Sequence, residues 1–527
     1  MSSSPILPPD SVNRRAAPDT SSIILMLAFM LGLGLRLSAT TTYDFPLNDG
    51  GLFYTMVQDL LQNGFRIPTY SSYNSANIPF VYPPLGLFLA AALVKVGMPI
   101  VQVFRFIPAL ASVLTIPAAY SLTRKIVGER LPAAFAALIV AVVPASFEWR
   151  IMGGGITRSF GFLFGLLTLD ALCSVLATPS RRSIALTFVF GTLTVLAHPE
   201  ATVHTALGAL ALVAFRLRRP AVGGMLVLSA GLTLLISAVW WLPAVRAHGF
   251  GPWFGAAGSS DWIPAYVLFF RLLSGLDPVT IVLSLIGALW GDRRTLGLLS
   301  VYGFSMFVVL PRSAPQFAIV LIAMLFGIGA QAVINRLLKP LDTSTSPSAA
   351  RLSKFPVSAR ALALLLAFLF VPNWVATVTS PILLALTPAE RLAMSWAREH
   401  TSPDSRFLVI EGVEFYAAKN AEWFPALSGR VNAVTVQGNE WLEDVDIADQ
   451  IALLRELERC GYAGVDCISA WAAASGIEFT HLYVVSREPT KPDLEPCCEI
   501  LLDSLGASDA YRLVYANADV SVFERRK

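Results

Sequence analysis

Carboxylates and glycines gather in the segment that follows the first apolar run of the chain, over residues 40–101. Asp44 and Asp49 both stand there, and the pair Gly50-Gly51 directly follows Asp49. Acidic residues are costly to hold near hydrocarbon, so their presence at the rim of a helix bundle indicates a functional site. A carboxylate in that position could act as a general base. We therefore predict the active site in this segment.

A second segment could bind an anion. The run Gly153-Gly154-Gly155 is followed by Arg158 at the expected start of a helix. Backbone amides and a guanidinium at a helix amino terminus suit a phosphate, so Gly154, Gly155 and Arg158 are candidate phosphate ligands. Alternatively, the glycines only allow a tight loop against neighbouring helices. Glu148, which opens the same segment, could supply a further carboxylate.

His198 and Glu200 form a third candidate, between two apolar runs. These titratable groups could position a substrate, assist proton transfer or bind a divalent ion together with Asp49. The alternative is a polar turn in which Glu200 caps the next helix. We assign no set of metal ligands, so a divalent cation is a cofactor that we do not favour, and no other cofactor is indicated.

The composition places these residues in a polytopic α-helical membrane protein. Hydrophobic residues make up 55% of the 527 residues, charged residues 14%, and the mean hydropathy is +0.62. A soluble domain has about 25% charged residues. The part after residue 387 holds 23 acidic and 13 basic residues, which leaves 13 of the 36 acidic and 26 of the 39 basic residues before it. We predict a membrane domain over 22–380 and an acidic soluble domain over 387–527.

The apolar runs predict about eleven transmembrane helices. The first run, 22–37, is close to a full span, follows Arg14 and Arg15, and lacks a small-residue cleavage site, so we expect a retained helix. The tail over residues 1–21 is then cytoplasmic. The later runs lie at roughly 102–123, 131–148, 158–177, 183–197, 201–216, 222–243, 276–290, 295–310, 315–334 and 358–378.

The basic residues in the loops test which side of the membrane each loop faces. Loops that should face the cytoplasm contain clusters such as Arg124-Lys125 and Arg293-Arg294, as the positive-inside rule requires. This agreement treats Pro83–Val96, only about 14 residues long, as an interfacial helix rather than a crossing. The Ser-, Thr- and Pro-rich linker over 341–358 is then a cytoplasmic loop. An odd number of crossings places the C-terminal domain outside, and we expect the plasma membrane as the location.

Residues 387–527 return to the pattern of an α/β domain. Polar and aromatic residues at Glu422–Pro425 and Gln437–Trp441 are predicted in loops, where they could cover the membrane site, bind a carbohydrate or simply pack. Thr387 and Glu390 have the pattern of a helix N-cap. Strands are predicted at Arg406–Ile410, His481–Val485, Tyr511–Tyr515 and Val520–Phe523, and helices at Pro388–His400, Ile447–Cys460 and Cys498–Leu505.

Four of the five cysteines fall in this domain. An outside location allows disulfides, and Cys460 with Cys467, across a short glycine-containing loop, is the preferred pair. Reduced thiols are the alternative. We do not expect the vicinal pair Cys497 and Cys498 to bond to each other. No histidine lies at ligand spacing from these cysteines, so we predict no zinc site.

The order of features in the first part of the chain forms a family pattern. A first helix ends in Arg36, a loop places an aromatic at Phe53 or Tyr54 after Asp49, a Tyr82-Pro-Pro-Leu-Gly86 step follows, and Arg105 opens a helix ending on Arg124-Lys125. This order resembles the GT-C glycosyltransferases, in particular the protein O-mannosyltransferases and the lipid A aminoarabinose transferases. The resemblance is specific over residues 20–150 and looser over the remaining helices.

The resemblance implies transfer of a sugar from a polyprenyl-phosphate carrier to an acceptor on the outer face of the membrane. It implies that Asp49 is the general base and that a basic residue of the later helices, here Arg312, holds the carrier phosphate. Extension of Arg312 to the lipid head groups is the alternative. Tyr54 and Tyr82 are candidates to line the substrate site, although interfacial anchoring explains such tyrosines more often.

The chain departs from the family pattern at two places. Many members carry Asp-Glu in the first loop where this chain has Asp49-Gly50, and the run of glycines replaces a second acidic motif. Asp44 and Glu148 are the candidate substitutes for the missing carboxylate.

Two other classes of protein share such helices. A transporter or flippase of a lipid-linked precursor should hold its polar residues near mid-membrane on broken helices, whereas here they gather at the rim. A catalytically silent relative that binds glycolipids would share everything except a working base. We expect a polyprenyl-phosphate sugar donor and membrane lipids as partners, a protein, glycan or lipid as acceptor, and no nucleic acid.

Overall fold

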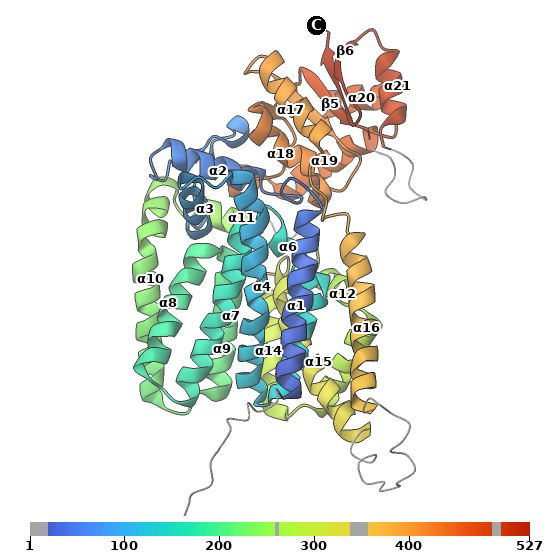
Figure 1. The fold of residues 1–527 in the computed structure, drawn as a ribbon. Coiled ribbons are helices and arrows are strands. Elements are labelled where there is room, and N and C mark those ends of the chain that lie inside the picture. Colours follow the sequence, from blue (N-terminus) through green and yellow to red (C-terminus); the bar gives the residue numbers. More distant parts are fainter. Residues whose placement is uncertain (1–18, 259–262, 338–356, 487–496, 527) are drawn as a thin grey trace, which may run out of the picture.

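A computed structural model describes residues 19–258, 263–337, 357–486 and 497–526 of the chain (Figure 1). Long helices lie side by side in a bundle, and the C-terminal residues form a layer of helices and strands at one end of it. We call this end of the bundle the site end. Most of the predicted tail over 1–21 and of the linker over 341–358 lies outside the described residues.

Each of the eleven apolar runs predicted from the sequence coincides with a helix. Five described helices are long and apolar enough to cross a membrane, and a sixth crossing results if the bent pair α12 (Ala265–Ser274) and α13 (Pro278–Trp290) counts as one. The helices are α1 (Thr20–Thr41), α4 (Ile100–Val127), α5 (Arg130–Val142), α7 (Gly155–Ala177), α8 (Arg181–Ala197), α9 (Pro199–Arg216), α10 (Pro220–His248), α13 (Pro278–Trp290), α14 (Arg293–Val309), α15 (Ala314–Leu337) and α16 (Val357–Val378). The number of crossings therefore stays a prediction.

Proline makes one of these helices shorter than predicted. α5 ends at Val142 rather than near residue 148, because Pro144 forces the residue before it out of the helical region. The chain continues through the 3₁₀ turn η2 (Pro144–Ser146) and the short helix α6 (Glu148–Ile151). This break turns the following residues back onto the segment 40–101 at the site end.

The segment 40–101 folds over the site end. α3 (Leu85–Lys95) coincides with the predicted interfacial segment, whereas α2 (Gly51–Gln62) is absent from the sequence-based prediction. Leu52, Met56 and Leu60 recur every four residues along α2 and are fully buried, so they form the face that packs on the neighbouring helices. The remaining elements are β1 (Tyr70–Ser71), η1 (Tyr73–Ser75) and β2 (Ile78–Pro79).

The C-terminal residues form a five-stranded mixed sheet in the order β4-β3-β5-β7-β6. β4, β3 and β5 are parallel, while β7 and β6 run antiparallel to their neighbours. All four predicted strands are present, and Thr387 forms the predicted capping box with Glu390. The elements are α17 (Pro388–His400), β3 (Arg406–Ile410), η5 (Phe415–Ala417), α18 (Lys419–Ser428), β4 (Val431–Asn432), η6 (Asn439–Trp441), α19 (Ile447–Cys460), α20 (Val465–Ser475), β5 (His481–Val485), α21 (Glu499–Gly506), β6 (Tyr511–Ala516) and β7 (Val520–Arg525).

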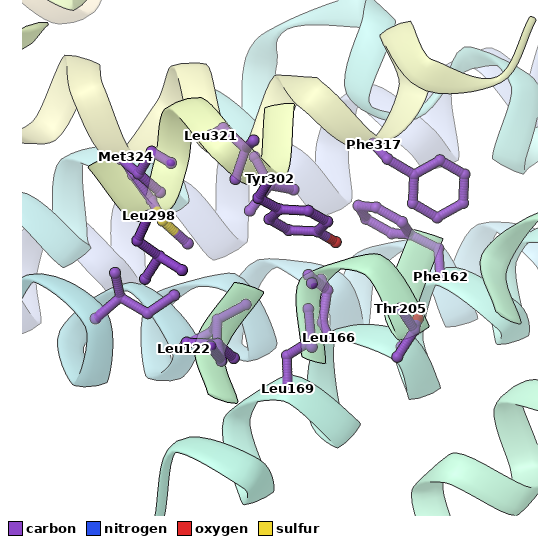
Figure 2. Close-up of a pocket in the computed structure, with 16 residues that line it drawn as sticks. Leu122, Phe162, Leu166, Leu169, Thr205, Leu298, Tyr302, Phe317, Leu321 and Met324 are labelled. Carbon is purple, nitrogen blue, oxygen red and sulfur yellow. The ribbon is translucent and has the colours of Figure 1, made fainter. Parts of the chain in front are cut away.

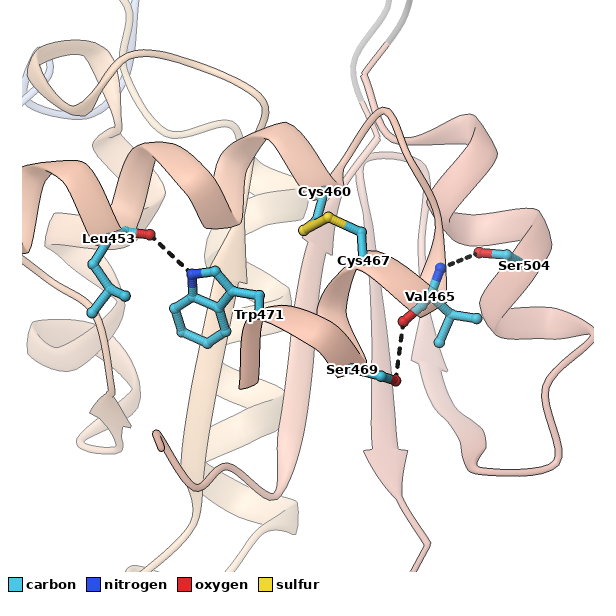
Figure 3. The surroundings of a disulfide bond; sticks show 7 residues. All are labelled: Leu453, Cys460, Val465, Cys467, Ser469, Trp471 and Ser504. Carbon is cyan, nitrogen blue, oxygen red and sulfur yellow. Dashed lines mark hydrogen bonds between the residues drawn. A yellow bond between two sulfur atoms is a disulfide. The ribbon is translucent and has the colours of Figure 1, made fainter. Parts of the chain in front are cut away.

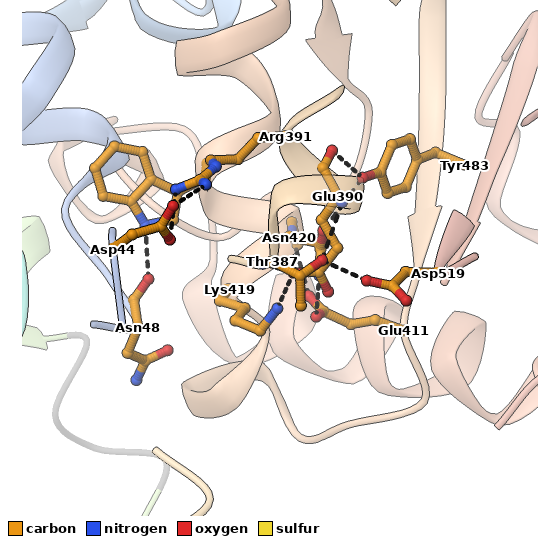
Figure 4. A network of polar contacts seen from close by, with 12 residues as sticks. Asp44, Asn48, Thr387, Glu390, Arg391, Glu411, Lys419, Asn420, Tyr483 and Asp519 are labelled. Carbon is orange, nitrogen blue, oxygen red and sulfur yellow. Dashed lines mark hydrogen bonds and ion pairs between the residues drawn. The ribbon is translucent and has the colours of Figure 1, made fainter. Parts of the chain in front are cut away.

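A buried polar network holds α18 inside this domain (Figure 4). Asn420 donates hydrogen bonds to the carboxylates of Glu390, at 2.7 Å, and Glu411, at 3.0 Å. The Lys419 ammonium pairs with Glu390. Buried charges persist only where they are paired and hydrogen-bonded, so this network fixes the orientation of α18. Residues Glu422–Pro425, which we predicted in a loop, lie in this helix.

Two disulfides are present in the domain. Cys460 at the end of α19 is bonded to Cys467 in α20 (Figure 3). Cys497 and Cys498 are also bonded to each other, so our expectation for this vicinal pair is wrong. The bond lies against Gly412 and Gly461, where an added Cβ atom would meet the sulfur atoms. The absence of two side chains makes room for it.

Candidate active site

The Asp49 carboxylate lies at the start of α7. Its Oδ1 accepts a hydrogen bond from the Gly154 amide at 2.9 Å, and its Oδ2 pairs with Arg158 in the first turn of the helix. The residue is only 8% exposed. A helix amino terminus favours negative charge through its free amides and its dipole. The anion at this predicted anion site is therefore the protein's own carboxylate.

Glycine is required on both sides of this contact. Gly50 has a φ of +126°, a conformation that favours glycine. A Cβ atom on Gly153 would collide with the Asp49 carbonyl oxygen. The Gly153 amide donates to the Leu47 carbonyl at 2.9 Å, and the Gly155 amide donates to a carbonyl at the same distance. The glycines thus let two backbones approach, and their amides bond within the protein.

The C-terminal domain closes over the residues that flank Asp49. The Glu422 carboxyl in α18 accepts hydrogen bonds from the amides of Gly50, at 2.6 Å, and Gly51, at 3.0 Å. The buried Trp423 indole donates to the carbonyl of Asn48 at 2.7 Å. The backbone on each side of the carboxylate is therefore held by the same helix.

Tyr82 forms an aromatic wall of the site. The Thr157 hydroxyl donates to its hydroxyl at 3.4 Å. Its ring packs edge-on against Phe53 and Trp441, with centroids 4.7 Å and 5.6 Å away, and lies 6.0 Å from the His198 ring. Burial raises the pKa of Tyr82, so the phenol stays protonated and keeps its hydrogen-bond donor.

His198 and Glu200 lie at the turn between α8 and α9. Burial, followed by the guanidinium groups of Arg158 and Arg312, holds the pKa of His198 well below its usual value, so the ring is neutral. Its Nδ1 accepts from the Ala201 amide at 3.3 Å and caps α9. Glu200 pairs with Arg312 at 3.3 Å across the turn before α15. These predicted residues share a wall with Tyr82.

Three other candidates occupy different places. Asp44 forms an ion pair with Arg391 of α17, with oxygen–nitrogen distances of 2.6 and 3.0 Å (Figure 4). Tyr54 packs its ring against Trp423 at 5.6 Å between centroids. Loss of water contact raises the pKa of Glu148 in α6 to about 7. Within the described residues, no hydrogen bond or ion pair joins Asp44 or Glu148 to Asp49.

Arg150 is a buried cation beside the site that we did not predict as a site residue from the sequence. Arg150 of α6 is 2% exposed and donates to the carbonyls of Ser146 and Gln316. Its guanidinium lies over the Phe162 ring, 3.5 Å from the centroid. An arginine next to a run of apolar residues was the available signal. The described part of the chain contains no group of three or more His, Cys, Asp or Glu side chains placed to bind a metal ion.

A small apolar cavity lies inside the bundle, and Figure 2 shows the side chains that line it. It has a volume of about 30 Å³ between α4, α7, α9, α14 and α15, which is room for only one or two water molecules. Phe162 lies in its wall and contacts Arg150, and Phe317 lies in its wall and faces His204 with ring centroids 4.3 Å apart. Two rings of the cavity wall therefore contact Arg150 and His204 on their other sides.

The fold that positions these residues is the fold of the GT-C membrane glycosyltransferases, to which the similar solved structures belong. No protein-family model matches the sequence, and no curated protein matches it by sequence.

Three of these structures show the extent of the likeness. The archaeal oligosaccharyltransferase AglB from Archaeoglobus fulgidus, solved with an inhibitory peptide and a dolichol-phosphate, has a TM-score of 0.57 and 15% identity over 88% of this chain and 69% of its own. ArnT from Cupriavidus metallidurans in the apo state has a TM-score of 0.51 and 13% identity over 96% and 98%. The arabinofuranosyltransferase AftD from Mycobacteria has a TM-score of 0.52 and 16% identity over 95% and 40%.

Proposed function

We propose that the chain is a glycosyltransferase that moves a sugar from a polyprenyl-phosphate-linked donor to an acceptor, with Asp49 as the general base. The observation that carries the proposal is the Asp49 carboxylate, held at the start of α7 in a fold shared with membrane glycosyltransferases. Displacement at an anomeric carbon needs a group that takes the acceptor proton and balances oxocarbenium-like charge. The phosphate is a good leaving group, so no strong acid is needed.

Arg158 connects the base to the donor. Its guanidinium is paired with Asp49, and a guanidinium carries five N–H donors that suit a phosphate equally well. A donor phosphate that binds Arg158 would compete with Asp49 for these N–H groups and free Oδ2 to face the acceptor hydroxyl. The base then becomes available when the donor is in place. Arg312, whose charge acts on His198 as that of Arg158 does, is the second cation for the phosphate.

The apolar cavity marks where a carrier lipid could enter the bundle only if the lining helices separate. Its lining is almost wholly hydrocarbon and aromatic, so a polyprenyl segment that parted these helices would gain the usual free energy of apolar burial. Arg150 lies over Phe162 and near Phe317, at 3.5 and 5.9 Å from the ring centroids, so one end of the cavity wall contacts a cation. A lipid that entered from this end would hold its phosphate near Arg150.

We further propose that the site end faces outward from the plasma membrane and that the amino terminus is inside. The basic clusters Arg124-Lys125 and Arg293-Arg294 support this orientation through the positive-inside rule. The disulfides of the C-terminal domain support it as well, because they persist in oxidising compartments. Residues 387–527 would then be an extracytoplasmic domain over the site.

The direct test is Asp49→Asn, which keeps the shape of the side chain and removes its basicity. A general base contributes about 10²- to 10⁴-fold, so we expect at least about 100-fold slower transfer. Membranes that contain either form are incubated with radiolabelled polyprenyl-phosphate hexose, pentose and aminopentose, and consumption of the labelled donor is measured.

A matched control is Asp59→Asn. Asp59 belongs to the same segment, but its carboxylate accepts from Ser71 and Ser72 at 3.0 and 2.6 Å and so has a structural role. The control should keep most of the activity. Full transfer by a correctly inserted Asp49→Asn protein would overturn the proposal.

A catalytically silent glycolipid-binding protein is the second candidate. The observation that favours it is that both oxygens of Asp49 already have partners, Gly154 and Arg158. In that case the wild-type protein binds a polyprenyl-phosphate sugar but consumes none of the three donors.

A further inference from the structure

A carboxyl group from the C-terminal domain reaches the backbone of the catalytic loop. Glu422 Oε1 accepts hydrogen bonds from the amides of Gly50, at 2.6 Å, and Gly51, at 3.0 Å, the two residues after Asp49. The Tyr73 hydroxyl donates to the Glu422 carbonyl at 2.6 Å and joins η1 to the same point. One side chain thus caps the amino terminus of α2 and restrains the loop that carries the base.

The helix that carries Glu422 is held rigidly. Lys419 and Asn420, one turn earlier in α18, are bound in the buried network with Glu390. Trp423, the next residue, is fully buried and bonded to Asn48. The Glu422 carboxyl therefore has little freedom to move away. A change in its charge must alter its hydrogen bonds with the amides of Gly50 and Gly51.

We propose that Glu422 is a positioning residue that fixes Asp49 in the site and adjusts the charge that the site presents to an anionic ligand. This inference rests on the proposed function only for the nature of the ligand, a polyprenyl phosphate. Glu422 does not contact the reacting atoms; it acts through the backbone of Gly50-Gly51 and through its charge.

The charges around Glu422 determine the direction of its effect. Asp49 and Arg158 face it from the membrane side, and Tyr73 faces it from η1, with Glu440 acting on the same tyrosine. Burial, followed by repulsion from Asp49, raises the pKa of Glu422 to about 8. Glu422 is then neutral at pH 7, and the charges of Asp49 and Arg158 cancel. Above pH 8 the site gains one negative charge and repels a phosphate.

Binding of undecaprenyl phosphate to the purified full chain in nanodiscs tests this effect. From pH 7 to pH 9 the dissociation constant should rise about tenfold more for the wild type than for Glu422→Gln. The reason is that like charges interact strongly in a partly buried site. Glu422→Gln keeps an oxygen for the two amides and cannot ionise, so it should lack this extra loss. The lipid phosphate titrates equally in both experiments, so its effect on binding cancels in the comparison.

Two further variants separate positioning from charge. Glu422→Ala removes the acceptor for both amides and should weaken binding at pH 7 and pH 9 alike. Glu414→Gln is the matched control, because Glu414 belongs to the same domain and pairs at the surface with Arg455 at 3.3 Å. It should follow the pH dependence of the wild type.

An infrared titration gives a readout that needs no ligand. The difference spectrum of wild type minus Glu422→Gln should contain the carbonyl stretch of a protonated carboxyl at pH 7 and lose it between pH 7 and pH 9. Protonated carboxyls common to both proteins, such as Glu148 with its pKa of about 7, cancel in this difference. If wild type and Glu422→Gln show the same pH dependence of binding and the same spectrum, the inference fails. If undecaprenyl phosphate does not bind the wild type but the infrared band titrates as expected, the proposed ligand fails and the protonation of Glu422 stands.

Discussion

Two ion pairs at the site end differ in how much water reaches them. The side chains of Arg158 and Asp49 are 18% and 11% exposed, whereas those of Arg312 and Glu200 are 45% and 21% exposed. The first pair is further held by the Gly154 amide and by α18, which clamps the flanking backbone. The second pair bridges two turns at the rim of the bundle.

The difference in exposure gives the two ion pairs different properties: the buried pair is fixed in place, and the more exposed pair can open. A buried charge needs its partner and its hydrogen bonds, because removal of the partner leaves an uncompensated charge. An exposed pair contributes little, so it can open at small cost when a ligand arrives. We therefore expect the first pair to set the geometry of the reaction and the second to guide the donor phosphate.

Removal of the Arg158 charge should have the largest effect. Arg158→Gln leaves the buried Asp49 carboxylate without its cation, so we expect a loss of about 3 to 5 kcal/mol in the free energy of unfolding. We also expect at least about 100-fold lower kcat/KM for the donor, a typical effect of removing one preorganised group that stabilises developing charge. Thermal unfolding in detergent and donor kinetics measure the two effects.

The double variant with Asp49→Asn sharpens this test. It contains no uncompensated charge at this position, so it should recover much of the stability without recovering activity. If Arg158→Gln alone keeps wild-type stability and activity, the buried pair is not the centre of the site.

The positions and ends of the helices follow from local patterns in the sequence. Apolar runs marked the helices of the bundle, and the Thr387-Glu390 pattern marked the start of α17. Pro144 carried a local signal as well, since it ends α5 at Val142. Asp49 could be singled out because a carboxylate at a membrane edge is costly wherever it stands in the chain.

The partners of Asp49 could not be predicted in the same way. Glu422 lies 372 residues after Gly50 in the chain, and only the docking of the C-terminal domain brings them together. The glycine run and Arg158 indicated an anion at the start of α7 but not which anion. The structure places Asp49 there, which the spacing of residues along the chain does not reveal.

Removal of the Arg312 charge should have an intermediate effect. Because this pair is half exposed, we expect Arg312→Gln to raise KM for the donor about threefold to tenfold and to leave kcat unchanged. The effect should shrink at high ionic strength. Arg246→Gln, which changes an exposed arginine in the last turn of α10, is the control. No change in KM would assign Arg312 to the lipid head groups, and an effect as large as that of Arg158→Gln would contradict the contrast between the pairs.

The pair between Asp44 and Arg391 should contribute least, because the Asp44 side chain is 64% exposed. Its hydrogen bond to Arg391 lowers the pKa of Asp44, so the contribution to stability is present above the unfolded pKa of about 4 and is lost as the pH falls through the lowered value. Asp44→Asn should therefore cost at most about 1 kcal/mol at pH 7 and nothing at low pH, as thermal unfolding would show. Transfer activity should change less than about twofold, since the carboxylate faces α17 and a surface pair has so small an effect. A loss of activity close to that of Asp49→Asn would instead place Asp44 in the reaction.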